Sequence, residues 1–175
     1  MKRFLTRLVP VALLSLVLFP LPAQAAGSDG ILTCPLGTIT STYDPPLSPV
    51  TQQVALDING TVTGCLPNTQ NITGGQFHAD STGNINCLTG GPSMGVFSFT
   101  WNTGEVTKAS YPEITISPRP VGVTVILLTG EVISGPYAGG TMVLQTTVLD
   151  FDVTACLRGD VDALGGAIEV VFTDL

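Results

Sequence analysis

The chain has 175 residues, of which 11% are charged, and thirteen acidic residues against six basic ones give a net charge of −7. Because phosphate groups are bound by clustered lysine and arginine, this balance argues against nucleic acid and anionic membrane surfaces as partners. The length suits one domain with one hydrophobic core.

The first 25 residues predict a secretory signal peptide. Three basic residues come first, and an apolar run follows from Leu8 to Leu21. Small residues at Ala23 and Ala25 then predict cleavage before Ala26. A retained membrane anchor is the alternative, but the run is about fourteen residues, short of the roughly 20 that a spanning helix needs. We therefore expect a secreted, extracellular domain at residues 26–175, with a net charge of −10 once three basic residues are removed.

No later segment holds eighteen consecutive apolar residues, so no membrane insertion of the mature chain is expected. Four cysteines follow the predicted signal: Cys34, Cys65, Cys87 and Cys156. An even number in an oxidising compartment predicts two disulfides, with three connectivities open. We favour Cys34–Cys65 and Cys87–Cys156, since each pair would link neighbouring segments of a meander. Because there is no CxxC pair and one histidine, neither a metal site nor a cofactor is expected.

Alternating hydrophobicity runs through the chain and predicts strands. In Val50–Val62 the apolar side chains fall on one parity, and Phe97, Phe99 and Trp101 share one face of the next clear example. Asn102–Gly104 and Gly135–Gly140 read as turns. No segment shows a helical stripe with caps. Eight strands are expected near 36–43, 50–63, 73–80, 94–102, 105–116, 121–133, 141–155 and 166–173.

Short connections between consecutive strands predict a single disulfide-stabilised, all-β domain with an antiparallel meander. A closed up-and-down barrel and a two-layer β-sandwich both fit, and we favour the barrel because closure removes exposed edges. The irregular alternation in 121–133 suggests strong twist or a bulge.

Several short motifs resemble those of small secreted bacterial proteins of unknown function, found mainly in actinomycete-type genomes. The family patterns are TYxPPL, GxC, TWNxG, GxVxSGxYxG and a near-terminal AC. The matching segments are Thr42–Leu47, Gly64-Cys65, Thr100–Gly104, Gly130–Gly139 and Ala155-Cys156. The resemblance implies an all-β fold and two disulfides, and it brings no known activity.

The segment 148–162 is rich in acidic residues, which makes calcium binding a hypothesis for it. Asp150, Asp152, Asp160 and Asp162 are candidate ligands, but the spacing is not that of an EF-hand loop. We expect Asp150 and Asp152 to point outward from a strand end, with Phe151 and Val153 facing the core. The tripeptide at 158–160, Arg-Gly-Asp, is short enough to arise by chance, and whether the four acids bind calcium stays open.

Catalysis by a hydrolase would need a base and a nucleophile in a recognisable arrangement. His78 alternates with Phe77 and Ala79, so we expect it to face solvent, and no Gly-x-Ser-x-Gly elbow is present. Hence no enzyme activity is expected. The leading hypothesis is a secreted β-module that binds an extracellular protein, a glycan or another component of the cell envelope.

The alternative is a barrel that carries a small apolar ligand, and a hydrolase is a distant third. Phe97, Phe99 and Trp101 are the candidate lining residues for such a ligand. A cavity of several hundred Å³ would favour the carrier, whereas a filled interior would leave function to the surface.

Overall fold

The computed structural model describes residues 30–67, 70–118, 123–149 and 151–174, so the predicted signal peptide and its cleavage site lie outside the described residues. The described residues form nine strands and one short helix. In chain order these are β1 (Ile31–Cys34), β2 (Leu36–Leu47), β3 (Gln52–Thr63), β4 (Gly74–Ile85), β5 (Ser93–Trp101), β6 (Val106–Pro118), β7 (Val123–Ser134), β8 (Thr141–Leu149), α1 (Val153–Arg158) and β9 (Val161–Thr173).

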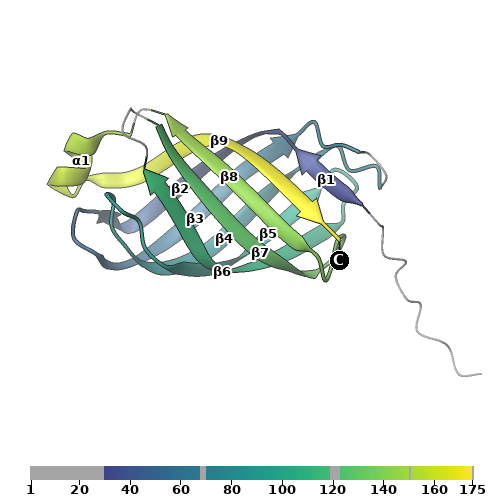
Figure 1. The fold of residues 1–175 in the computed structure, drawn as a ribbon, viewed down its shortest axis with the longest axis horizontal. Coiled ribbons are helices and arrows are strands. Elements are labelled where there is room, and N and C mark those ends of the chain that lie inside the picture. Colours follow the sequence, from purple (N-terminus) through teal and green to yellow (C-terminus); the bar gives the residue numbers. More distant parts are fainter. Residues whose placement is uncertain (1–29, 68–69, 119–122, 150, 175) are drawn as a thin grey trace, which may run out of the picture.

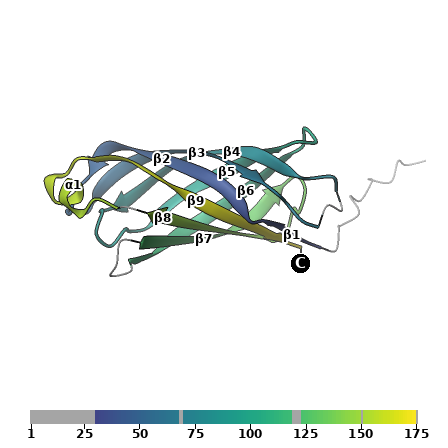
Figure 2. The ribbon, with the colours of Figure 1, turned by 90° about the horizontal axis from the view of Figure 1, so that it is seen from above.

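Strands β2 to β9 form a closed antiparallel barrel (Figures 1 and 2). Each strand pairs with the next along the chain, and β9 pairs with β8 on one side and with β2 on the other. The ring therefore has no free edge, and the predicted up-and-down barrel is confirmed over the sandwich. Register shifts interrupt the ladder between β6 and β7, in agreement with the irregular pattern of that region.

Strand β1 was not expected from the sequence and lies against the end of β9, beyond β2. Its backbone also meets residue 66, because the Thr33 N–H donates to the Leu66 carbonyl at 2.7 Å and the Leu66 N–H donates back at 2.8 Å. The disulfide between Cys34 and Cys65 holds the same junction together. This disulfide is the one predicted from the expected meander, and it fastens β1 to the β3–β4 connection.

The alternation read from the sequence separates the two faces of the barrel wall. On β3, Val54, Leu56, Ile58 and Val62 are buried, whereas Gln53, Ala55, Asp57, Asn59 and Thr61 are exposed. The strand begins two residues later than predicted, since Val50 lies outside it and is 68% exposed. The inner face of this strand is thus apolar and its outer face is mainly polar.

Aromatic side chains fill the half of the barrel that lies toward β1. The ring of Phe99 has its centroid 5.2 Å from that of Phe77, 5.5 Å from Trp101 and 5.2 Å from Phe172. Tyr137, from the β7–β8 turn, stacks on Phe172 at 5.8 Å.

Gly60 of β3 has no side chain, and this leaves space for the Phe77 ring. A Cβ at Gly60 would lie 2.2 Å from the Phe77 ring, so no other residue fits there without displacing it.

The predicted strand at 141–155 is wrong in its last part. Strand β8 ends at Leu149, and helix α1 follows because Asp152 caps it: one carboxylate oxygen accepts the N–H of Thr154 at 2.8 Å and of Ala155 at 3.1 Å. Gly159 ends the helix in the left-handed conformation at φ 75°. These are standard N- and C-terminal signals, and they override the strand preference of the sequence.

Two consequences follow for the residues of this segment. Val153, which was expected to face the core, is 51% exposed on α1. Cys156 is bonded to Cys87 as predicted, but it sits on a helix rather than on a strand.

We expect Phe99→Ala to lower the free energy of unfolding by about 3–5 kcal/mol, because it removes a fully buried ring from the aromatic cluster. The neighbouring Thr100→Ala, on the exposed face of the same strand, should cost no more than about 1 kcal/mol. Urea denaturation followed by circular dichroism measures both. Similar losses for the two variants would contradict the assignment of the faces.

Candidate ligand cavity

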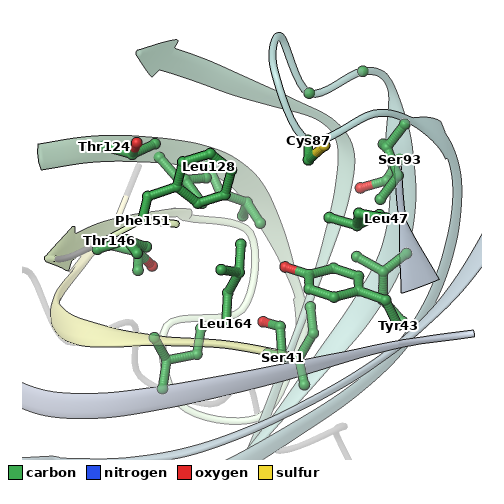
Figure 3. A pocket seen from close by; sticks show the side chains of 18 of the residues that line it. Ser41, Tyr43, Leu47, Cys87, Ser93, Thr124, Leu128, Thr146, Phe151 and Leu164 are labelled. Atoms are coloured by element: carbon green, nitrogen blue, oxygen red, sulfur yellow. The ribbon is translucent and has the colours of Figure 1, made fainter. Parts of the chain in front are cut away.

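The half of the barrel nearer α1 contains a cavity of about 380 Å³ (Figure 3). Its wall takes side chains from strands across the barrel, from β2 and β3 to β8 and β9, and from the segment that leads into α1. The apolar members are Ile39, Leu47, Leu56, Ile58, Ile85, Leu88, Phe97, Ile126, Leu128, Leu144, Val148, Phe151, Val153 and Leu164.

The cavity exists because inward-facing side chains become smaller along the barrel axis. Strand β5 runs from Ser93 at the cavity to Trp101 in the filled half, and β9 runs from Leu164 to Phe172. Eight strands enclose a space that large side chains fill and small ones leave open for a ligand.

The polar groups on the wall carry no charge among the described residues. They are Ser41, Tyr43, Asn86, Ser93, Thr124 and Thr146. Burial raises the pKa of Tyr43 to about 12, although the Ser41 hydroxyl beside it acts in the opposite direction. The phenol is therefore a neutral hydrogen-bonding group at any physiological pH.

A disulfide joins the two segments at this end of the barrel. Cys87, in the β4–β5 loop, is bonded to Cys156 of α1, and the Cys87 N–H donates to the Ser48 carbonyl at 3.0 Å. Within the loop, Asn86 Oδ1 accepts the N–H groups of Leu88 at 2.9 Å and Thr89 at 2.8 Å. Loop and helix are thereby held beside the cavity.

Of the three aromatics named as candidate lining residues, the cavity wall takes Phe97. Phe99 and Trp101 lie in the filled half of the barrel. The Trp101 indole N–H donates to Thr107 Oγ1 at 2.8 Å, and that hydroxyl donates to the Pro136 carbonyl at 3.1 Å. Phe99 and Trp101 therefore belong to the packed core.

His78 projects from the outer face of β4, away from the cavity. One ring nitrogen lies 3.0 Å from Asn59 Oδ1 and the other lies 3.2 Å from Asp80 Oδ2. The predicted solvent-facing position of this histidine is confirmed.

Two of the acids considered as calcium ligands, Asp152 and Asp160, have local roles in the structure. Asp150 lies outside the described residues, Asp152 caps α1, and Asp160 pairs with Arg158 at 2.9 Å. Within the part of the chain that the structure describes, no three histidine, cysteine or acidic side chains gather in a way that would hold a metal ion. The Arg-Gly-Asp tripeptide forms the end of α1, with its two charged side chains paired to each other.

Sequence reasoning missed most of the cavity wall, including Ser41, Tyr43, Ser93 and Leu164. A usable signal was present on β2, where Ser41 has the same parity as the buried Ile39. A small polar residue on the inner parity of a strand indicates space inside a barrel.

No family model, curated protein or solved structure matches the chain. No helix among the described residues is long and apolar enough to cross a membrane.

The capping of α1 predicts a pH effect. The Ala155 N–H is the largest cause that lowers the pKa of Asp152, and the Thr154 N–H and the Arg158 charge act in the same direction. A lowered native pKa means that the charged cap stabilises the fold above the unfolded pKa, and that this contribution is lost as pH falls through the native value.

The free energy of unfolding of the wild type, minus that of Asp152→Asn, should therefore decrease as pH falls from about 5 toward 2. Urea titrations at each pH measure this difference. A difference that stays constant or grows on acidification would show that the carboxylate charge does not stabilise α1.

Proposed function

We propose that the protein is a secreted carrier that binds a small apolar ligand inside its barrel. The observation that supports this most directly is the cavity of about 380 Å³. Ligand pockets typically measure about 300–1,000 Å³ and combine an apolar lining with a few polar groups, as this one does. Since protein interiors are otherwise packed as densely as organic crystals, a space of this size favours a binding role.

The chemistry of the wall favours binding over catalysis. General acid–base catalysis needs a group that exchanges a proton near the working pH. The described lining residues have neutral side chains, the Tyr43 phenol stays protonated to about pH 12, and His78 lies on the outer face. A hydrolase accordingly remains the weakest of the three hypotheses.

The two disulfides support an extracellular site of action. They are consistent with an oxidising compartment, and together with the predicted signal peptide they favour secretion. The cavity also favours the carrier over a module that acts through its outer surface on a protein or glycan.

Titration with N-phenyl-1-naphthylamine, a neutral dye whose fluorescence rises in apolar surroundings, tests the proposal. We expect saturable binding with one site per chain. Ser41→Phe should weaken binding by at least about fivefold, because the phenyl ring would take space that the ligand needs and overpacking costs roughly 1–3 kcal/mol.

Thr40→Phe is the matched control, since residue 40 lies on the exposed face of the same strand. It should change the dissociation constant by less than about twofold, which corresponds to under 0.5 kcal/mol. Circular dichroism verifies that both variants are folded. Absence of saturable binding, or equal weakening by both substitutions, would contradict a ligand site within the barrel.

A further inference from the structure

One hydroxyl group on the cavity wall has no hydrogen-bond partner among the described residues. Ser93 opens β5, is 2% exposed and contributes its side chain to the wall (Figure 3). Its Oγ makes no hydrogen bond within the described part of the chain. A buried hydroxyl that is left unpaired destabilises the fold, so its retention needs a reason.

A second unpaired hydroxyl lies behind the first. Tyr111 on β6 faces Gly95 of β5 across the ladder, and a Cβ at residue 95 would lie 2.8 Å from the phenol oxygen. The tyrosine ring thus crosses the bare backbone toward β4. Burial raises the pKa of Tyr111, and the neighbouring hydroxyls of Ser81 and Ser93 act in the opposite direction.

The three hydroxyls differ in whether they already form a hydrogen bond within the described residues. Ser81 already donates to the Met94 carbonyl at 3.0 Å. Neither Ser93 nor Tyr111 completes a hydrogen bond of good geometry within the described residues. A hydroxyl has one donor and two acceptor positions, so a rotation that lets Tyr111 donate to Ser93 would leave the Ser93 donor for a ligand.

The absence of charge among the described lining residues restricts the ligand further. A buried carboxylate or ammonium group without an opposite charge is strongly disfavoured. A neutral oxygen, in contrast, needs only the donor that Ser93 presents.

We infer that the ligand is a neutral molecule with an apolar body and one carbonyl or hydroxyl oxygen, which accepts a hydrogen bond from Ser93. This inference rests on the proposed function. Tyr111 is a positioning residue, which orients the Ser93 hydroxyl through its own.

Three naphthalenes of similar shape test the inference by displacement of N-phenyl-1-naphthylamine. 2-Acetylnaphthalene carries the oxygen, 2-ethylnaphthalene lacks it, and 2-naphthoate is charged. The ketone should bind the wild type about threefold to tenfold more tightly than the hydrocarbon, as one hydrogen bond provides. It should bind at least about tenfold more tightly than the carboxylate.

Ser93→Ala should remove the preference for the ketone and leave the affinity for the hydrocarbon within about twofold. Tyr111→Phe should reduce the same preference by a smaller factor, an effect on the oxygen-bearing probe that a merely structural role would not produce. Ser98→Ala is the matched control, because residue 98 lies on β5 with the opposite parity to the buried Phe97 and Phe99. It should leave the preference unchanged.

The results distinguish the inference about the ligand's chemistry from the proposed carrier function. If the dye and the hydrocarbon bind but Ser93→Ala does not alter the ketone preference, or if 2-naphthoate binds best, the inference is overturned and the cavity remains a binding site. If neither the dye nor any naphthalene binds the wild type, the proposed function itself fails.

Discussion

Strand β9 pairs with β8 along its second half and with β2 along its first, and this double pairing closes the sheet into a ring. Closure satisfies the backbone groups of two strand edges at once, which would otherwise be open to other chains. It also sets the width of the barrel, because the enclosed space follows from the number of strands. Once the width is set, the volume of the inward-facing side chains determines which parts of the interior are filled and which parts stay open.

That volume is distributed unevenly along the axis. The aromatic rings around Phe99 and Phe172 occupy one half, and Tyr137 adds a ring from the adjoining turn. The other half is lined mainly by aliphatic side chains, serine, threonine and glycine, with Tyr43, Phe97 and Phe151 as its aromatic members. Since the same strands supply both halves, core residues and cavity residues are separated by position along each strand rather than by element. The aromatic half can therefore stabilise the fold while the other half retains the cavity.

Local pattern was enough to predict the strands but not the cavity. The alternation through Val54, Leu56 and Ile58 depends on neighbouring residues, which is why the barrel could be anticipated. The cavity is lined by residues such as Ser41 and Leu144, which are about one hundred positions apart in sequence. Their placement around one space depends on strand stagger, which no local pattern encodes. Helix α1 was missed because its six residues are too few for a helical period, although Asp152 and Gly159 are recognisable caps.

The cavity end of the barrel depends on the compartment in which the chain folds. A helix of six residues has little stability of its own, because isolated helices shorter than about 12–15 residues are marginal in water. The bond between Cys87 and Cys156 fixes α1 against the β4–β5 loop, and Leu88 of that loop and Val153 of the helix both line the cavity. This part of the wall is thus held by a covalent link that persists in oxidising surroundings. The aromatic half combines ring packing with the other disulfide, Cys34–Cys65, which fastens β1. The complete cavity wall therefore depends on oxidising conditions as well as on apolar burial.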